Sequence, residues 1–338
     1  MMRVYKHIVL MMALVLAAVG CERRTLLDPS FTTELNVMVN IDAVQNVTCD
    51  VYNPNIPLPN IKPEMLRVLF YEPGKNRVAG ESYISSISTN ADGNRVISGR
   101  VGVLPGEYEM VIYNFDVRST QIRNDQSHAT IEAHTSPVSS TLASRFETRV
   151  GEKLDIRYQP DHLIVATSPN EYIPWHEEVH TIHAEAKSVV ETYYMQVKVE
   201  GLEYVSSAQA VISGVAGSNL IGNRKRVDSP ETAVYFTLVK SEDKGVPVLC
   251  NTFNTFGRLP ESRNMLYLTF DIHTVDGRAI TKEFEISHLF ETQECIDHKW
   301  LLLNETIVVP PPATPPSNEG GFAPEVGDWD REEHDIIL

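Results

Sequence analysis

The feature that most constrains the fold is the alternation of apolar and polar residues over short stretches that turn residues separate. Residues 34–41 place leucine, valine and isoleucine on one face, and residues 192–199 repeat this pattern. A period of two is typical of a strand with one buried face. Turn signals follow one another closely, and we find no sustained stripe with the helical period of 3.6 residues. The sequence therefore predicts an all-β sandwich architecture.

Further strands are expected in both halves of the chain. They cover residues 65–71, 108–114, 163–166, 208–214, 234–239, 265–272, 279–286 and 300–309. The dipeptide Asp276-Gly277 fits a hairpin turn between two of these strands, because Asp-Gly tolerates a positive φ. For residues 287–297 we expect a short helix.

Three prolines between residues 160 and 174 mark the expected boundary between two domains, because proline lacks a backbone N–H and disfavours sheet interiors. A chain of 338 residues is long enough for two domains of ordinary size. We therefore expect tandem sandwiches over residues 31–165 and 175–309. A proline-rich spacer and an acidic tail, expected to be disordered, occupy residues 310–338.

The N-terminus resembles the signal peptide of a bacterial lipoprotein. Two cations precede an unbroken apolar run of 12 residues, from 8 to 19, which is too short to span a bilayer. Gly20 and Cys21 then match the end of a lipobox, in which the cysteine carries the lipid. This pattern predicts a signal peptide over residues 1–20, a lipid on Cys21 and a tether over residues 21–30. The alternative is an ordinary secretory peptide that is cut near a chance cysteine.

The composition limits the partners of the chain. The formal net charge is −16, which disfavours binding to nucleic acid and electrostatic adhesion to anionic lipid. Attachment to a membrane is therefore expected through acyl chains on Cys21. Neither a phosphate-binding glycine loop nor a serine-nucleophile motif is present in the sequence, and we expect no cofactor.

Three cysteines follow Cys21, namely Cys49, Cys250 and Cys295. An odd number allows at most one internal disulfide in an oxidising compartment. Cys250 with Cys295 is the pairing we favour, because both fall in the same half of the chain. Three buried, reduced thiols are the alternative.

One motif has the spacing of a zinc hydrolase. The run His176-Glu177-Glu178-Val179-His180 fits the H-E-x-x-H pattern, in which two histidines on one helical face bind zinc and the glutamate acts as general base. This hypothesis needs a helix from about residue 175 to residue 190. A preceding proline and β-branched residues oppose a helix, and the same residues suit an edge strand. We therefore expect neither a metal site nor catalytic residues here.

The C-terminal tail combines acidic and large apolar residues. Residues 319–335 hold seven acidic side chains and one arginine. Such a segment buries too little apolar surface to fold alone. Phe322, Val326 and Trp329 nevertheless stand out as large apolar groups, and we interpret them as partner-binding residues. The alternative is that Trp329 folds back onto a sandwich.

Several short motifs, taken in their order, resemble a known group of proteins. They are the lipobox, residues 201–207 (Gly-Leu-Glu-Tyr-Val-Ser-Ser), residues 211–217 (Val-Ile-Ser-Gly-Val-Ala-Gly), residues 253–257 (Phe-Asn-Thr-Phe-Gly), the proline spacer, and the tail motifs at residues 320–322 and 326–329. Together they resemble a family of Bacteroidales lipoproteins of unassigned function, which is similar to the fimbrillin-like and fimbrial anchor proteins. The resemblance implies two transthyretin-like β-sandwich domains, an outer-membrane lipid anchor and no catalytic residues.

Three functions of different kinds follow from these observations. The leading hypothesis is a non-enzymatic outer-membrane lipoprotein that acts as a fimbrial anchor or accessory subunit in surface assembly or adhesion. Its partners are then the membrane, through the lipid, and other surface protein subunits. The alternative is a glycan-binding surface lipoprotein, and the third is the zinc hydrolase.

Overall fold

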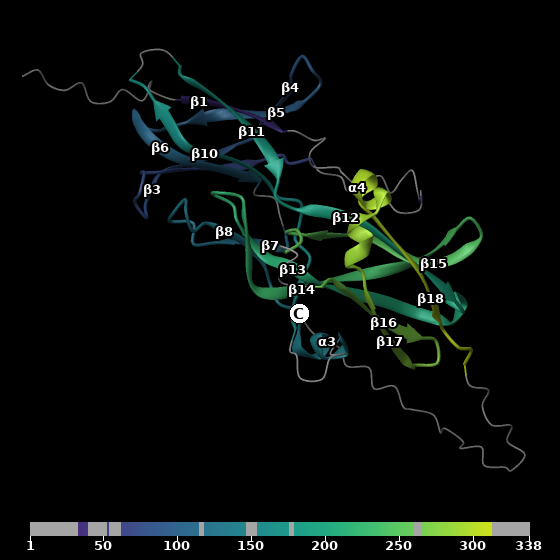
Figure 1. Cartoon of the computed structure of the whole chain (residues 1–338). Coiled ribbons are helices and arrows are strands. Elements are labelled where there is room, and N and C mark those ends of the chain that lie inside the picture. Colours follow the sequence, from purple (N-terminus) through teal and green to yellow (C-terminus); the bar gives the residue numbers. More distant parts are fainter. Residues whose placement is uncertain are drawn as a thin grey trace, which may run out of the picture.

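The computed structural model describes residues 33–39, 53, 62–114, 118–146, 154–175, 179–259 and 265–312. Within these ranges strands make up most of the chain, which confirms the expected all-β sandwich fold. The strands form one sheet of eight and one sheet of ten (Figure 1).

The first sheet follows the order β3-β2-β6-β10-β11-β1-β5-β4. Its strands are β1 (Thr33–Val39), β2 (Leu66–Tyr71), β3 (Val78–Ile84), β4 (Ser86–Thr89), β5 (Arg95–Val101), β6 (Gly106–Asn114), β10 (Ile164–Ile173) and β11 (Thr181–Ser188). β10 and β11 pair at one corner, where Ile164 lies opposite Ser188. From this corner β10 continues along β6, while β11 continues along β1. The two halves of the sheet enclose a common apolar core, and we call this part of the molecule the first sandwich.

β2 is buried on both faces, which explains why its sequence is nearly all apolar. Leu66, Val68 and Phe70 point into the core of the first sandwich. Leu69 and Tyr71 point the other way, into a cluster that contains residues from both sheets. β6 divides its side chains in the same manner. These two strands therefore connect the first sandwich to the second.

The second sheet follows the order β17-β16-β13-β14-β15-β12-β18, with β7, β8 and β9 attached to β13 and β14. Its strands are β7 (Thr120–Arg123), β8 (Glu132–Thr135), β9 (Asp155–Tyr158), β12 (Glu191–Glu200), β13 (Val205–Leu220), β14 (Lys225–Asp243), β15 (Val246–Thr255), β16 (Tyr267–Thr274), β17 (Ala279–Glu285) and β18 (Trp300–Val308). β14 pairs with β13 as far as Leu238 and with β15 from Val239 onward. Through this change of partner the sheet encloses its own apolar core, and we call this part of the molecule the second sandwich.

Stacked aromatic side chains mark the centre of the second core. The rings of Phe236 and Phe253 lie 4.4 Å apart and nearly parallel, and Tyr193 stacks on Phe253 at 5.8 Å. The helical segments are α3 (Ser140–Ala143), α4 (Gln293–His298) and the 3₁₀ turns η1 (Ser144–Phe146), η2 (Leu202–Tyr204) and η3 (Ser287–Glu291). η3 and α4 cover the second core, which confirms the short helix expected over residues 287–297.

The division of the strands between the two sheets does not follow the expected domain boundary. β11 follows the expected boundary and belongs to the first sheet, whereas β7, β8 and β9 precede it and join the second. β10 runs through the expected linker, and its Pro169 lies where the pairing with β6 shifts register. A bulge tolerates a proline because the ladder is already interrupted there. The division into two domains stays a prediction.

The favoured disulfide is wrong. Cys250 and Cys295 are both free and buried. They belong to different apolar clusters, because Cys250 packs with Tyr194 and Val248 while Cys295 faces the second core. Burial raises the pKa of both thiols. Cys49 lies outside the described residues.

Candidate interaction surfaces

The zinc hypothesis fails on secondary structure. It needs a helix through residue 190, but Thr181–Ser188 forms β11, which pairs with β1 in parallel. His183 lies exposed on this strand, and His180 directly precedes it. The strand alternative is confirmed for residues 181–183, which pair with β1 on one side, whereas β11 pairs with β10 only at Lys187 and Ser188. His176, Glu177 and Glu178 lie outside the described residues. Within the described part of the chain, no group of three or more His, Cys, Asp or Glu residues is placed to hold a metal ion.

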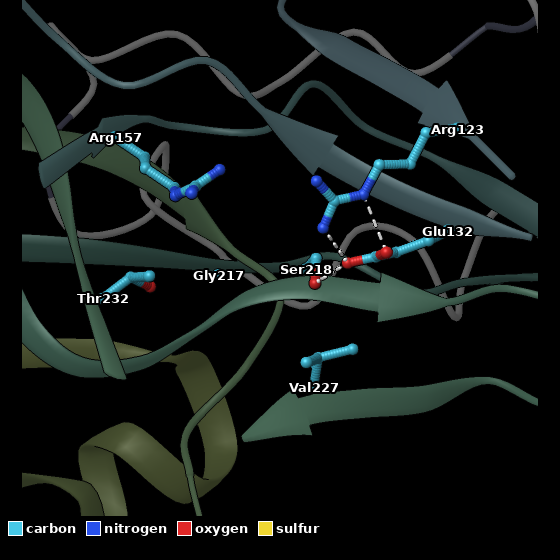
Figure 2. A pocket seen from close by; sticks show the side chains of 7 residues that line it. All are labelled: Arg123, Glu132, Arg157, Gly217, Ser218, Val227 and Thr232. Carbon is cyan, nitrogen blue, oxygen red and sulfur yellow. Dashed lines mark hydrogen bonds and ion pairs between the residues drawn. The ribbon is translucent and has the colours of Figure 1, made fainter. Parts of the chain in front are cut away.

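A small cavity of about 50 Å³ lies where five strands meet, and Figure 2 shows the side chains around it. It is lined by Arg123, Glu132, Arg157, Gly217, Ser218, Val227 and Thr232. β13 pairs with β14 on one side and with β8 on the other, β14 pairs with β9, and a bridge joins β9 to Pro137 after β8. Segments that are far apart in sequence therefore surround the cavity.

A bulge in the β13–β14 hairpin opens this space. Ala216 pairs with Glu231 and Ser218 pairs with Val227, so three residues of β14 lie opposite Gly217 alone. A Cβ at Gly217 would lie 2.5 Å from the side chain of Thr232. Only glycine permits this approach without a shift of the strands.

The cavity wall holds a buried carboxylate with three donors. Arg123 donates from Nε and Nη2 to the two oxygens of Glu132, each at 2.8 Å, and the Ser218 hydroxyl donates to the same group. The Glu132 side chain is 9% exposed. The guanidinium of Arg123 holds the pKa of this carboxyl below its usual value. The group is therefore ionised and paired at neutral pH.

The second arginine of the cavity is also engaged. Arg157 donates from Nε to Asp155 at 2.9 Å and from Nη1 to the carbonyl of Thr135 at 2.8 Å. A cavity of this size admits one or two water molecules, whereas ligand pockets measure several hundred cubic ångströms. We therefore interpret the cavity as a polar joint between β7, β8, β9 and the β13–β14 hairpin.

The tip of the β13–β14 hairpin docks on the first sandwich. The carbonyl of Gly222 accepts a hydrogen bond from Thr167 of β10 at 2.6 Å. A Cβ at Gly222 would lie 1.9 Å from the carbonyl oxygen of His128. Arg224 donates to the carbonyl of Val165 at 2.7 Å. Arg224 thus anchors the tip to β10, while Arg226 pairs with Glu191 of β12 within the second sheet.

An apolar cluster lies beneath the same contact and connects the two sandwiches. We call it the joining cluster; its buried members are Leu69, Tyr71, Val111, Tyr113, Ile131, Ala133, Leu163, Val165, Val189, Val190, Ala216, Ile221, Phe256 and Leu259.

A second contact between the two sandwiches involves Asn53, which donates to Tyr194 of β12 at 3.3 Å and to Ser241 of β14 at 3.1 Å. Asn53 lies between β1 and β2 in sequence, so a connection of the first sandwich reaches the second.

The outer strands of both sheets differ in charge. β17 is an edge of the second sheet and carries Lys282, Glu283 and Glu285. β4 is an edge of the first sheet, has the sequence Ser-Ile-Ser-Thr and is exposed throughout. Charged side chains discourage the addition of a foreign strand to a sheet edge. β4 lacks them, and its Ile87 is 47% exposed. Of these two edges, β4 is the better suited to pair with another chain.

Two of the sequence predictions concern residues that the structure does not describe. The lipid site at Cys21 and the partner-binding residues Phe322, Val326 and Trp329 lie outside the described ranges. Within those ranges, no helix is both long and apolar enough to cross a membrane.

The paired residues of the cavity were not recognised in the sequence. Arg123 and Glu132 become neighbours only when β7 pairs with β8, and Ser218 joins them from β13. The available signal is weak, namely opposite charges on either side of the connection between two short strands.

Comparison with a curated protein gives a relative in Bacteroides ovatus. The chain is 28% identical over 240 residues to a protein named provisionally as the fimbrium anchoring subunit Fim4B. The match covers 71% of this chain and 62% of the relative, so the chain spans less than two thirds of that protein.

One solved structure supports the fold. A crystal structure of a protein described provisionally as an adhesin from Bacteroides ovatus superposes with a TM-score of 0.59 at 23% identity, covering 88% of this chain and 99% of that one. The fimbrial anchor protein Mfa2 from Porphyromonas gingivalis gives a TM-score of 0.45 at 12% identity, covering 80% and 87%, a likeness too weak to support an inference.

Family membership follows from a separate match. A family model described as a domain of unknown function, DUF5119, matches residues 20–236, which is more than half of the chain. The chain therefore belongs to the DUF5119 family.

Proposed function

We propose that this protein is a non-enzymatic, lipid-anchored fimbrial anchor or accessory subunit of the outer membrane. The observation that carries the proposal is the 28% identity over 240 residues to a protein named as a fimbrium anchoring subunit. The lipobox-like sequence that ends at Cys21 supports the lipid anchor. The two-sandwich architecture, with an uncharged exposed edge at β4, supports binding to other subunits.

The assembly mechanism that fits this geometry is strand addition. An extended segment of a partner pairs with the free backbone groups of β4 through main-chain hydrogen bonds. Ile87 supplies an apolar contact at the centre of this edge. The acidic tail with Phe322, Val326 and Trp329 provides a second contact with a partner.

The lipid anchor is tested by Cys21→Ser in the native host. We expect the variant to leave the membrane fraction and to lose labelling by a palmitate analogue. Unchanged labelling would contradict the anchor.

The β4 contact is tested by Ile87→Lys, which adds a charge to the exposed edge. Folding is expected to be unchanged because the side chain is 47% exposed, and the amount of co-purified fimbrial subunit is expected to fall. Thr281→Lys on the charged edge β17 is the matched control and is expected to retain the partner. Equal recovery of the partner with both variants would rule out β4.

The tail is tested by deleting residues 317–338. We expect normal folding and membrane attachment, with loss of a co-purifying partner or of surface assembly. Unfolding of the truncated protein, or a buried and rigid Trp329 in the purified monomer, would contradict a partner-binding role.

A further inference from the structure

Four exposed apolar side chains gather at the end of the first sandwich that lies away from the second. They are Leu104, Tyr172, Trp175 and Val179, with exposed fractions of 55%, 63%, 61% and 45%. We call them the distal apolar cluster. Single exposed apolar residues are ordinary, but several large ones at one end of a molecule mark a contact surface.

The strand register places these residues together. Ile173 at the end of β10 pairs with Gly106 at the start of β6. Leu104 lies two residues before Gly106 and Trp175 lies two residues after Ile173, so both extend beyond the same last pair of this ladder. Tyr172 belongs to the neighbouring pair of the ladder. The connections that hold Leu104 and Trp175 therefore lie side by side.

The start of β1 lies at this same end. Thr33 pairs with Val101, the last residue of β5, and Glu34 pairs with Thr181, the first residue of β11. Val179 directly precedes that strand. Figure 1 shows the end of β10 and the start of β1 on the side opposite β15 and β18. The chain therefore enters the fold beside the distal apolar cluster.

The length of chain before β1 limits the distance to the proposed lipid. Twelve residue steps separate Cys21 from Thr33, which span at most about 40 Å when fully extended. The end of the sandwich that carries the cluster is thus the end closest in sequence to the acyl chains. Tryptophan and tyrosine favour the boundary between headgroups and acyl chains, since each joins an apolar ring to a polar group.

We propose that the distal apolar cluster rests on the phospholipid surface that holds the acyl chains of Cys21. This inference depends on the proposed lipid anchor. Contact through the cluster orients the first sandwich toward the membrane and the second away from it. The acidic chain gains no electrostatic attraction from anionic lipid, so apolar contact is the term that sets the orientation.

The test uses the lipidated full chain with Trp300→Phe and Trp329→Phe, which leaves Trp175 as the remaining tryptophan of three. The protein is reconstituted into vesicles of phosphatidylethanolamine and phosphatidylglycerol, with and without acyl chains brominated near the headgroup. We expect brominated lipid to quench the emission of Trp175. The matched control carries Trp175→Phe and Val239→Trp, which moves the tryptophan to the β14–β15 hairpin at the far end, and no quenching is expected.

A second measurement does not depend on tryptophan variants. Amide hydrogen exchange over residues 102–105 is expected to slow in the vesicle-bound chain relative to Cys21→Ser in solution. Flotation with vesicles separates the possible failures. If the protein floats but Trp175 is not quenched and exchange is unchanged, the inference is wrong, and a cluster that binds a protein subunit gives this result. If the lipidated chain does not float, the proposed anchor itself is wrong and the inference falls with it.

Discussion

Replacement of Arg123 by methionine tests whether the polar joint around the cavity holds the fold together. The change removes two charge-assisted hydrogen bonds of 2.8 Å from Glu132 and leaves its carboxylate with the Ser218 hydroxyl. Each such bond contributes about 1.5–3 kcal/mol. The Arg123 side chain is 50% exposed, so solvent screens this end of the pair. We therefore expect a loss of about 2–3 kcal/mol in the free energy of unfolding, below the full cost of breaking a buried pair.

A double-mutant cycle measured by urea denaturation isolates the pair. Arg123→Met with Glu132→Gln should cost less than the sum of the single changes, with a coupling energy of about 1–2 kcal/mol. The exposed pair Lys187–Glu185, 3.8 Å apart, is the control, and its coupling should stay below about 0.5 kcal/mol. Because the pKa of Glu132 is lowered, the coupling should be complete above pH 4.5 and disappear as the pH falls further. A coupling within about 0.3 kcal/mol of zero at pH 7 would refute the reasoning.

Three further predictions follow from other buried groups. Burial lowers the pKa of His162 from 6.5 to about 4, so the unfolded chain binds the proton more readily and the free energy of unfolding should fall by about 2 kcal/mol between pH 7 and pH 5. In urea titrations, His162→Leu should reduce this pH dependence, whereas His183→Gln, at an exposed position, should not. Gly222→Ala places a Cβ 1.9 Å from the carbonyl oxygen of His128 and should lower the free energy of unfolding by about 1–3 kcal/mol. Gly102→Ala, with open space around the added Cβ, should be nearly neutral, so equal melting temperatures of the two variants would contradict the tight contact. Cys250 and Cys295 are free and buried, so both should react slowly with iodoacetamide in the native protein and fully after unfolding without a reductant. A mass two hydrogens lower in the unreduced chain would instead show a disulfide.

The strands with clear alternation were predictable from sequence, because their periodicity reflects one buried face. β1, β12 and the β16–β17 hairpin are examples, the last with Gly277 at a φ of +82°. β4 and β9 were missed because each has four residues, too few for a periodic signal. β10 was shortened because Pro169 reads as a strand breaker, although a bulge accommodates it.

The contacts between the halves of the chain were harder to predict. β8 pairs with the far end of β13, so Glu132 lies opposite Leu220. A pairing across nearly 90 residues leaves no local trace in the sequence. The role of Arg224 at the hairpin tip is hidden for the same reason, since its acceptor is the carbonyl of Val165. Local patterns determine strands, whereas the partners of those strands depend on the assembled core.

The position of β1 has a consequence for how the molecule carries tension. β1 lies inside the first sheet, parallel to β11 and antiparallel to β5. A force applied to the residues before Thr33, with the far sandwich held, acts along the axis of this strand. The hydrogen bonds on both sides then share the load in shear, whereas an edge strand peeled sideways loses them one after another. When the chain is pulled through β1, the segments that connect its sheets should therefore extend before this strand separates from β5 and β11.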